Sequence, residues 1–380
     1  MIRVLWLAKG LGPGGMERLL ETHARVGDRS IFEFEAAYLV ERPHSIVGSL
    51  EELGVPVHRL EGGLASWPRQ LRRLVAEQRI DVVHTHSPMV AALARPVLRS
   101  MRNRPALVYT EHNSWDCYGT ATRLANAATY LLDDEQLAVS AAAATSAPAV
   151  LRPRMRELTH GIDVERLQQL DIDRVEIRER LGIGAEAKLV ITVAHLRAEK
   201  GYEVWLEAAK RVTEAREDVV FVSVGHGPLE AELREQHRRL GLDDRVRFLG
   251  FRDDAVELLA AADVCCFASH SEGLPVVVME AAALGVPIVA TAVGGLVGAI
   301  DDGMNGRLVP PGDPQALADA LSDVLGDDDV RKQMGEAMRS RAGRYDAIGA
   351  IDVIEALYRE VHAAHRGAGL AEAHRRGGAV

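Results

Sequence analysis

The stretch Ser271–Gly295, SEGLPVVVMEAAALGVPIVATAVGG, places two carboxylates beside a predicted helix N-terminus. Glu272 lies in a polar turn, and Pro275 follows at the first helical position, where a residue with fixed φ and no N–H is favoured. The helix carries Glu280 and ends before a short buried strand at 288–291. Backbone N–H groups at a helix N-terminus bind anions. Two carboxylates at such a point favour a ligand with both hydroxyls and phosphate, as in a sugar nucleotide.

The composition bounds the protein's class. Its 380 residues, 47% of them apolar, suffice for one large or two ordinary domains, and the net charge of −10 argues against a nucleic-acid partner. The three cysteines (Cys117, Cys265 and Cys266) include an adjacent pair in an apolar run, which favours reduced thiols. The first apolar run is short for a signal peptide, and no apolar span of about 18 residues lacks a charge or proline. We expect a cytoplasmic protein, with the inner face of the membrane as a second place of action.

The first strand pattern, at 2–8, leads into a glycine-rich loop and a helix at 16–26. Small residues in such a loop let backbone N–H groups approach a phosphate. Gly10, Gly12 and Gly15 also satisfy the dinucleotide pattern G-x-G-x-x-G, so an NAD-dependent oxidoreductase is one alternative. A tight turn with no ligand is another.

Strand and helix patterns alternate along the chain in two successive units. Strands are predicted at 2–8, 34–40, 55–60, 81–86, 106–110 and 136–139, and then at 188–193, 219–224, 246–249, 264–268, 288–291 and 306–309. This alternation predicts an α/β fold of two doubly wound parallel sheets, Rossmann-like domains that face a cleft. We place the domains at 1–165 and 166–347, and we expect 367–380 to be a frayed tail.

Polar residues follow several predicted strands of the first unit. His84, His86 and His112 lie where open α/β sheets place their ligands, although a hydrogen-bonded structural role is the commoner fate of any single histidine. Two segments are rich in arginine: Arg69, Arg72, Arg73 and Arg79, then Arg95, Arg99, Arg102 and Arg104. We interpret them as a solvated face, with a surface for an anionic acceptor or lipid headgroups as the alternative.

The second unit gathers cations, carboxylates and glycines at the ends of its strands. These residues are His195, Arg197, Lys200, Glu272 and Glu280, with glycines at 225, 227 and 273. Cations and free helix N–H groups suit a diphosphate, and carboxylates suit sugar hydroxyls. We find no Asp-x-Asp pair or His/Cys cluster that predicts a catalytic metal. A capping box with a solvated helix face would also explain the two glutamates, but carboxylates in so apolar a run need a partner.

These motifs resemble the retaining glycosyltransferases of family 4, which have the GT-B fold. The resemblance is carried by the Glu-x7-Glu spacing of Glu272 and Glu280, the Glu-Gly-Leu-Pro turn, Gly-x-Gly-Pro-Leu at 225–229, Lys200-Gly201, Gly14-Gly15 and His112. The six motifs occur in the family's order over nearly the whole chain. The resemblance further implies that the helix at 348–366 returns to the N-terminal domain.

The resemblance implies a role for each matching position. The expected catalytic residues are His112 and Glu272, at the donor sugar, and Lys200, on the diphosphate. Glu280 is expected to bind the ribose hydroxyls. The other expected donor-binding residues are Gly14, Gly15, His195, Arg197, Gly225, Arg252, Gly273 and Leu274. Members of the family usually need no metal, so we expect no metal site and no cofactor beyond the nucleoside-diphosphate sugar, which is a substrate.

One position departs from the family's pattern. Where the family has Gly-Arg-Leu before the lysine, this chain has Ala194-His195-Leu196, so His195 replaces the diphosphate-binding arginine. A neutral imidazole donates one hydrogen bond, whereas a guanidinium offers a charged fork. Either Arg197 takes over, or the donor is held more weakly, or His195 acts in its protonated form.

The resemblance favours a retaining, metal-independent transfer of a sugar from a nucleoside-diphosphate donor to an acceptor hydroxyl. The first domain is expected to bind the acceptor, which is a small molecule, a glycan or a lipid-linked sugar, and peripheral membrane contact is compatible with the last of these. The alternatives are the NAD-dependent oxidoreductase and a catalytically silent sugar-nucleotide-binding protein, which the missing arginine keeps open.

Overall fold

The computed structural model describes residues 1–63, 66–158 and 160–377 and divides into two compact units. Unit 1 comprises Met1–Ile162 and Asp346–Val380, and unit 2 comprises Asp163–Tyr345. The chain passes to unit 2 just before the short helix α7 (Val164–Gln168), whereas the boundary predicted at 165/166 falls inside this helix. The side chain of Asp163 accepts a hydrogen bond from the backbone N–H of Arg166 (3.0 Å), so α7 is capped within unit 2.

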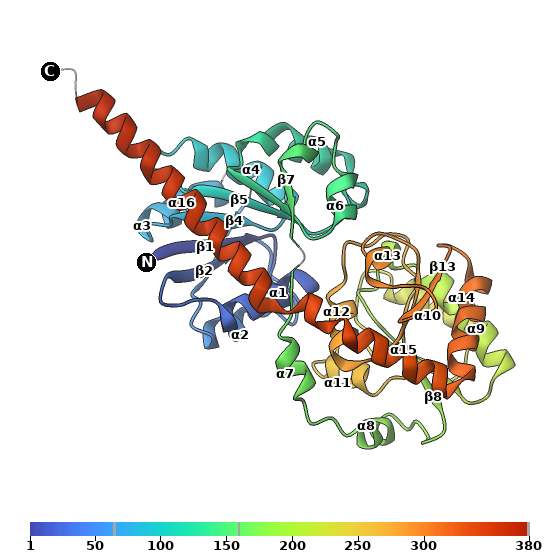
Figure 1. Cartoon of the computed structure of the whole chain (residues 1–380). Coiled ribbons are helices and arrows are strands. Elements are labelled where there is room, and N and C mark those ends of the chain that lie inside the picture. The colour runs from blue at the N-terminus through green and yellow to red at the C-terminus, as the bar shows by residue number, and fades with distance from the viewer. Residues whose placement is uncertain (64–65, 159, 378–380) are drawn as a thin grey trace. The chain divides into compact units, whose positions relative to one another are not determined.

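Unit 1 contains a parallel seven-stranded sheet with the order β3-β2-β1-β4-β5-β6-β7 (Figure 1). Its strands are β1 (Ile2–Ala8), β2 (Phe32–Tyr38), β3 (Val57–Arg59), β4 (Val82–Thr85), β5 (Ala106–Glu111), β6 (Glu135–Ala138) and β7 (Met155–Glu157). The order reverses between β1 and β4, which are direct neighbours with Val4 opposite Val82. The sequence predicted all of these strands except β7.

Helices cover both faces of this sheet because consecutive residues of β1 point to opposite sides. Trp6 belongs to a core shared with α1 (Gly15–Val26), α2 (Val47–Glu52) and α16 (Ala347–Gly377). Leu7 belongs to a second core shared with α3 (Trp67–Glu77) and α4 (Pro88–Arg99). The helices α5 (Thr120–Thr129) and α6 (Ala141–Ser146) complete the unit. This is the doubly wound arrangement that the sequence predicted.

The burial of Arg95 contradicts, for this residue, the prediction that the arginine-rich segments form a solvated face. It lies on α4, is 1% exposed, and forms an ion pair with Asp133 in which Nη2 and Oδ2 are 2.7 Å apart. Its guanidinium carbon lies 4.9 Å from the ring centre of Tyr109 and 5.4 Å from that of Tyr130. Arg95 is therefore part of the interior of unit 1, where the aromatic rings and the carboxylate offset the loss of its hydration.

The prediction of a frayed tail at 367–380 also differs from the structure, because α16 continues as one helix to Gly377. Residues 367–377 include three alanines, two arginines, one leucine and one glutamate, which favour helix, and the glycines at 367 and 369 weaken a helix without ending it. The last three residues of the expected tail, 378–380, lie outside the described residues. The helix packs on α1, β4 and β5 of unit 1.

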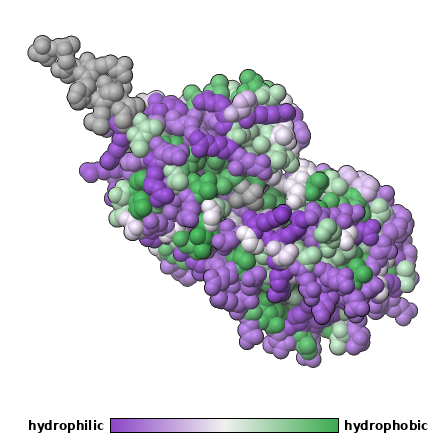
Figure 2. All heavy atoms as spheres, viewed as in Figure 1, coloured by the Kyte–Doolittle hydropathy of each residue, from purple (hydrophilic) through white to green (hydrophobic). Residues whose placement is uncertain are grey.

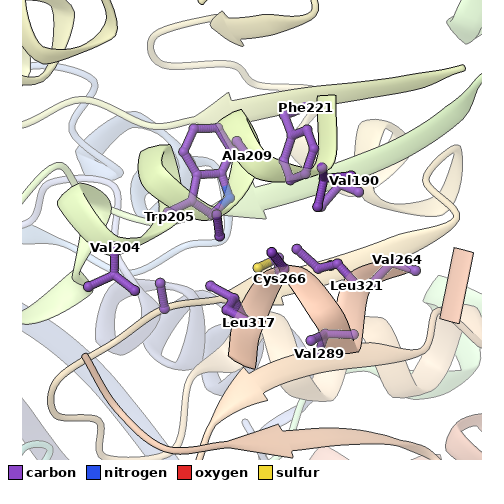
Figure 3. Close-up of a cluster of buried hydrophobic side chains, with 14 of the residues drawn as sticks. Val190, Val204, Trp205, Ala209, Phe221, Val264, Cys266, Val289, Leu317 and Leu321 are labelled. Atoms are coloured by element: carbon purple, nitrogen blue, oxygen red, sulfur yellow. The ribbon is translucent and has the colours of Figure 1, made fainter. Parts of the chain in front are cut away.

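Unit 2 contains a parallel six-stranded sheet with the order β10-β9-β8-β11-β12-β13. Its strands are β8 (Lys188–Val193), β9 (Val219–Val224), β10 (Val246–Phe248), β11 (Val264–Phe267), β12 (Ile288–Thr291) and β13 (Gly306–Val309). Its helices are α7, α8 (Arg174–Arg180), α9 (Tyr202–Ala215), α10 (Glu230–Arg239), α11 (Ala255–Ala260), α12 (Val276–Leu284), α13 (Leu296–Ala299), α14 (Pro314–Gly326) and α15 (Asp328–Ser340). Figure 3 shows one face of its core, where Trp205 of α9 and Cys266 of β11 pack with Leu317 and Leu321 of α14.

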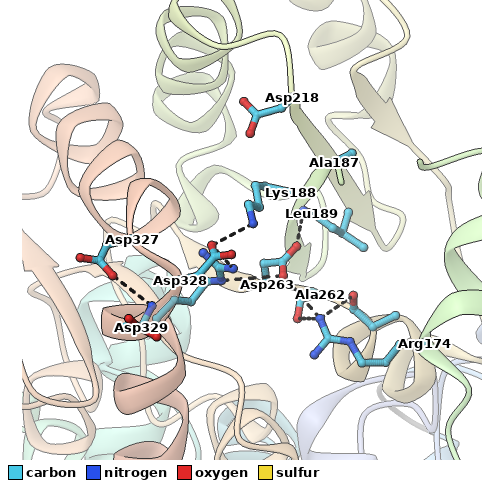
Figure 4. Close-up of polar contacts among 12 residues, drawn as sticks. Arg174, Ala187, Lys188, Leu189, Asp218, Ala262, Asp263, Asp327, Asp328 and Asp329 are labelled. Atoms are coloured by element: carbon cyan, nitrogen blue, oxygen red, sulfur yellow. Dashed lines mark hydrogen bonds and ion pairs between the residues drawn. The ribbon is translucent and has the colours of Figure 1, made fainter. Parts of the chain in front are cut away.

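Polar contacts hold the amino-terminal edge of the unit 2 sheet (Figure 4). Asp263, just before β11, accepts a hydrogen bond from the backbone N–H of Leu189 at 2.7 Å and pairs with Arg178 at 3.2 Å. Lys188, the first residue of β8, pairs with Asp328 at 2.9 Å. These residues lie at the opposite ends of the strands from the candidate site, so we assign them to stability.

The surface is mainly hydrophilic on the face that Figure 2 shows, with hydrophobic residues scattered between polar ones. Within the described part of the chain, no helix combines the length and the apolar character that a membrane span requires.

Candidate active site

The candidate site in unit 2 lies where its strand order reverses, between β8 and β11. Open α/β sheets bind ligands at this point because neighbouring chain segments leave the carboxyl ends of the strands in opposite directions. The loop after β8 contains His195, Arg197 and Lys200, and the loop after β11 contains Glu272. The backbone N–H of His270 donates to the carbonyl of Glu199 at 2.9 Å, so the two loops are joined directly.

Lys200 and Glu272 form the central contact of this site. The ammonium nitrogen of Lys200 lies 2.7 Å from both carboxylate oxygens of Glu272. The hydroxyl of Ser269 donates to Oε1 of Glu272 at 2.6 Å, and Thr291 Oγ1 donates to the backbone carbonyl of Ser269 at 2.6 Å. Glu272 is only 6% exposed, so a chain of contacts from β12 through Ser269 fixes its carboxylate. The sequence predicted both charged residues but not their pairing.

Two glycines let the neighbouring loops approach each other closely. Gly294, after β12, has φ +52°, and a Cβ there would lie 1.9 Å from the carbonyl oxygen of Glu272. Gly225, after β9, has φ +140°, and a Cβ there would lie 2.0 Å from the carbonyl oxygen of Ala194. Only glycine fits both the backbone angles and the space. These positions bring the loops after β9 and β12 against the loops that contain His195 and Glu272.

Glu280 and Pro275 locate the helix that follows this loop. Helix α12 starts at Val276, and Pro275 is its N-cap with extended backbone. The sequence had predicted Pro275 as the first helical residue, so the helix begins one residue later than predicted. Glu280 lies on α12 and is 5% exposed, so the alternative of a solvated helix face is wrong. Gly273 and Leu274 precede the helix, and the backbone N–H of Gly295 donates to the carbonyl of Gly273 at 2.6 Å.

His195, Arg197 and Arg252 surround the site with different degrees of constraint. Nδ1 of His195 lies 3.3 Å from the carbonyl oxygen of His226, which makes Nδ1 the donor. Arg197 has a side chain 52% exposed and reaches Glu199 only at 4.0 Å. Arg252 donates through Nε and Nη2 to both carboxylate oxygens of Asp254, at 2.7 and 2.6 Å. Arg197 is thus the arginine of this group that is least engaged.

The glycine loop of unit 1 occupies the corresponding position at the reversal between β1 and β4. Gly14 is the N-cap of α1 in extended conformation and Gly15 is its first residue. A Cβ at Gly10 or Gly12 would lie 3.0 Å from the side chain of Arg42, so these two glycines already accommodate a side chain of the protein itself.

Histidines from several segments meet beside this loop. His84, His86 and His112, which the sequence singled out, line a small cavity together with His23 and His160. Nδ1 of His86 lies 3.0 Å from Nε2 of His112, and the rings of His112 and His160 stack with centroids 5.5 Å apart. Loss of hydration lowers the pKa of all of these imidazoles, to about 4 for His160 and well below 6.5 for His84, His86 and His112. The ring cluster is therefore neutral at neutral pH.

Glu111, directly before His112, is a buried carboxyl that the sequence did not single out. The hydroxyl of Tyr109 donates to its Oε2 at 2.8 Å, and the hydroxyl of Tyr118 donates to Oε1. Burial raises the pKa of Glu111 to about 7, against the hydrogen bonds that favour its anion. This contact folds the 112–118 loop back on the end of β5.

The residues that sequence reasoning missed share one property. Ser269 and His160 have partners from other segments: Thr291 of β12 donates to the carbonyl of Ser269, and the ring of His160 stacks on that of His112. The position just after β11 was a usable signal for Ser269. Within the described residues, no group of three or more His, Cys, Asp or Glu side chains is arranged to hold a metal ion.

Comparison with known families gives a match in each unit. Residues 13–166 match the model described as Glycosyltransferase Family 4, and residues 173–341 match the model described as Glycosyl transferases group 1.

Curated relatives are glycosyltransferases or sugar-conjugate synthases by name. D-inositol 3-phosphate glycosyltransferase of Corynebacterium urealyticum is 37% identical over 55% of this chain and 52% of its own length. Alpha-D-kanosaminyltransferase of Streptomyces kanamyceticus is 34% identical over 50% of this chain and 49% of its own. The chain spans about half the length of these two relatives. N-acetyl-alpha-D-glucosaminyl L-malate synthase of Bacillus anthracis is 26% identical over 77% of this chain and 78% of its own.

Solved structures share the fold over nearly the whole chain. HepE of Anabaena, crystallised in complex with UDP-glucose, has a TM-score of 0.85 at 23% identity and covers 95% of this chain and 100% of its own. Sucrose-phosphate synthase of Thermosynechococcus elongatus has a TM-score of 0.81 at 19% identity, over 96% of this chain and 100% of its own. The two Rossmann-like units and these neighbours confirm the predicted GT-B fold.

Proposed function

The chain is a relative of the glycosyltransferases through both of its units, and we propose that it is a retaining glycosyltransferase that uses a nucleoside-diphosphate sugar. The observation that carries the proposal is the Lys200–Glu272 pair at the strand-order reversal of unit 2, on loops held together by glycines. This site offers a cation for a leaving diphosphate and a fixed carboxylate for sugar hydroxyls. A neighbour of the same fold was crystallised with UDP-glucose, which supports this class of donor.

In the reaction that we propose, the acceptor oxygen forms a bond to the anomeric carbon on the face from which the diphosphate departs. The bond between that carbon and the phosphate oxygen breaks, and the acceptor proton passes to the leaving oxygen. Lys200 neutralises the charge that develops on the diphosphate, so its contact with Glu272 weakens as the reaction proceeds. No bound metal enters this scheme, and product stereochemistry determined by NMR tests the retention.

The remaining roles follow from the resemblance and are proposals as well. Glu280 binds the ribose hydroxyls, and the backbone at Gly273 and Leu274 approaches the donor sugar. Gly225 follows β9 and lies against Ala194, and Arg252 follows β10; the resemblance assigns both residues to donor binding, Arg252 in the segment that passes the base. Gly14, Gly15 and His112 are assigned to the donor by the resemblance alone.

The replacement of the family's arginine by His195 bears on whether the protein is an active transferase or a catalytically silent sugar-nucleotide-binding protein. With Nδ1 donating to the carbonyl of His226, Nε2 of His195 has a proton to donate only in the imidazolium form. A neutral His195 therefore leaves the second diphosphate contact to Arg197, whose side chain is half exposed. We propose that Arg197 supplies this contact and that the protein is catalytically active.

The acceptor is a hydroxyl compound of unidentified class. Two relatives are named for D-inositol 3-phosphate and L-malate, so these compounds come first in an acceptor screen. Glycans and lipid-linked sugars follow. An NAD-dependent oxidoreductase is not favoured, since Arg42 lies against Gly10 and Gly12 and both family matches are glycosyltransferases.

Thermal stabilisation by UDP, GDP, dTDP, ADP, their sugars and NAD tests the donor site. A ligand at about 100 times its Kd adds about 2.7 kcal/mol, which gives a clear shift in Tm. We expect a shift with one nucleoside diphosphate that is lost in Glu280→Ala and kept in Glu232→Ala, a change at an exposed position of α10. A shift with NAD alone would overturn the proposal, and tight donor binding without transfer would establish the silent alternative.

A further inference from the structure

Aromatic rings from four segments of unit 1 form a column that ends at the stacked pair His112 and His160. Tyr358 of α16 packs edge-on against His84 at 5.7 Å, and the rings of His84 and His86 lie 4.1 Å apart. The rings of His86 and His112 follow at 5.3 Å. The column therefore connects the C-terminal helix to the histidine that we assign to the donor.

The inner end of this column is fixed by hydrogen bonds. Nδ1 of His84 lies 2.6 Å from the hydroxyl of Tyr358, and Nε2 lies 2.7 Å from Oγ1 of Thr110. Both ring nitrogens of His84 are thus engaged, and its ring cannot rotate without breaking a contact. The fixed ring of His84 packs against the ring of His86. His84 is therefore a hydrogen-bonded structural histidine, the role that the sequence analysis considered the commoner one.

The outer end consists of one hydrogen bond between two neutral imidazoles. Nδ1 of His86 and Nε2 of His112 are 3.0 Å apart, and a single hydrogen atom lies between them. If Nδ1 of His86 bears that hydrogen, Nε2 of His112 is the acceptor and the proton of His112 is on its Nδ1. If Nε2 of His112 bears it, both assignments are reversed. The tautomers of the two residues are therefore linked.

The other nitrogen of His86 selects between these two states. Nε2 of His86 is buried and has no hydrogen-bond partner within the described residues. A buried N–H without a partner is rarer in proteins than a buried acceptor that lacks one. The state with the hydrogen on Nδ1 of His86, and none on Nε2, is the favoured one.

We propose that His86 is a positioning residue that holds His112 as its Nδ1–H tautomer and in one ring orientation. His112 then offers the ligand a hydrogen-bond donor at Nδ1 and not a base. A donor suits a sugar oxygen, which fits the role that the resemblance implies for this residue. This inference rests on the proposed function for its ligand but not for the hydrogen bond itself.

Long-range ¹H–¹⁵N correlation NMR of ¹⁵N-histidine-labelled protein, without ligand at pH 7.5, tests the tautomers directly. We expect His112 and His86 both to show a protonated Nδ1 and an unprotonated Nε2. In His86→Leu we expect the His112 signals to move to a tautomer mixture. A wild-type His112 protonated on Nε2, or already averaged between two forms, would overturn the inference whether or not the protein is a transferase.

Two substitutions separate positioning from packing, since Leu is close to histidine in volume but has no polar group, whereas Asn is smaller and has one. Asn places its amide where Nδ1 of His86 lies and keeps a donor for His112, whereas Leu removes it. We expect His86→Leu to lose roughly 10- to 100-fold in turnover, with the KM for the donor changing less, and His86→Asn to recover most of this loss. His58→Leu and His58→Asn, on the edge strand β3, are the matched controls and should leave turnover unchanged.

The outcomes distinguish this inference from the proposed function. Equal losses in His86→Leu and His86→Asn, or no loss in either, would overturn the positioning role even if the protein transfers sugar. Should wild-type protein transfer nothing, the NMR result still decides the hydrogen bond, and donor affinity of the two variants replaces turnover as the second readout. If His86→Leu does not fold, the wild-type spectrum and His86→Asn remain decisive.

Discussion

The contact between Lys200 and Glu272 serves both stability and the proposed chemistry, and substitutions can separate the two. Lys200→Met removes the cation and leaves a carboxylate whose side chain is 5% exposed. We expect a loss on the order of 3 kcal/mol in the free energy of unfolding, measured in urea. Lys200→Met with Glu272→Gln should recover much of that stability, yet turnover should stay roughly 10²- to 10³-fold low because the diphosphate loses its cation.

The matched control is Lys210→Met on α9, whose ion pair with Glu214 spans 3.8 Å near the surface. Such a pair contributes about 0.5 kcal/mol or less. If Lys200→Met and Lys210→Met cost the same stability, the pair at the site is only a surface contact. Recovery of turnover in the double variant would remove Lys200 from the mechanism.

His195→Arg should tighten donor binding. An arginine restores a charged donor where Nε2 of a neutral His195 has no proton to give, and a hydrogen bond to a charged group contributes about 1.5–3 kcal/mol, roughly 10- to 150-fold in Kd. Titration calorimetry with the nucleoside diphosphate from the screen measures this. Arg197→Ala should weaken binding in the wild type and weaken it less in His195→Arg. Unchanged affinity in His195→Arg would mean that this position does not face the diphosphate.

Gly294 should tolerate no side chain. Alanine there would place Cβ 1.9 Å from the carbonyl oxygen of Glu272 at φ +52°, so the loop that holds this carboxylate must move. We expect Gly294→Ala to lower the free energy of unfolding by more than about 1 kcal/mol and to abolish the donor-induced Tm shift. At Gly298, on α13, a Cβ would meet no other described atom within 4 Å outside its own helix and chain neighbours, so Gly298→Ala should be neutral or stabilising by up to about 1 kcal/mol. Equal behaviour of the two variants would contradict this account.

Sequence reasoning found the charged residues of the site but not their partners. Glu272 and Lys200 stand out because charge is rare beside apolar strands, and the distance between them along the chain hides their contact. Ser269 looks like an ordinary polar residue until the strand order brings Thr291 near, and the sequence singled out His86 without its contact to His112. Pairing across a sheet depends on topology, which local periodicity does not contain.

At the scale of elements, α4 should depend on Arg95 for its place in unit 1. Arg95→Met would leave the buried carboxyl of Asp133 without its cation, and burial already raises the pKa of Asp133 to about 6. We expect a loss of roughly 3–5 kcal/mol in the free energy of unfolding, measured by urea denaturation. Adding Asp133→Asn should reduce the loss, since an amide costs less to bury than an unpaired carboxylate.

The matched control for this prediction lies on α3. Arg73 pairs with Glu77 one turn away at 2.7 Å with both side chains exposed, so Arg73→Met should cost about 0.5 kcal/mol or less. The sequence analysis grouped Arg95 with Arg73 because both belong to arginine-rich segments of the first unit. A small effect of Arg95→Met would restore that solvated-face interpretation.

Elements were predictable where burial was continuous. The parallel strands β1, β8 and β9 are runs of apolar residues, and the sequence gives their bounds without error. The edge strand β7 is three residues long and largely exposed, so it has no such run. Helix α5 has one buried residue, Asn126, and its sequence therefore lacks the apolar stripe that marks a core helix.

For the whole molecule, the alternation of strands and helices was enough to predict the two doubly wound units. The motifs in order then indicated the family, and the two family matches fall one in each half of the chain. The join between units was harder to place, because residues 155–168 contain a short strand and a short helix with weak patterns. The acceptor leaves no comparable signal, since its loops lack a shared motif.

Acid should destabilise unit 1 through its histidines. The native pKa is below 6.5 for His23, His84, His86, His112 and His160. As the pH falls from 6.5 to about 4, the unfolded chain therefore binds more protons at these histidines than the native state does. The stability that these histidines contribute above pH 6.5 is lost through this window. Glu111 and Asp133 act in the opposite sense, because their pKa values are raised to about 7 and about 6. Five histidines against two carboxyls give a net loss with acid.

His160→Asn isolates one of these contributions. With a native pKa of about 4, His160 alone accounts for a loss on the order of 1–2 kcal/mol between pH 7 and pH 5. Three of the four tryptophans, Trp6, Trp67 and Trp115, belong to unit 1, so urea unfolding followed by tryptophan fluorescence reports mainly on this unit. We expect the unfolding free energy of His160→Asn to fall less with acid than that of the wild type. Parallel pH profiles would show that the native pKa of His160 is the same as in the unfolded chain, about 6.5, and would contradict the loss of hydration that we assign to this ring.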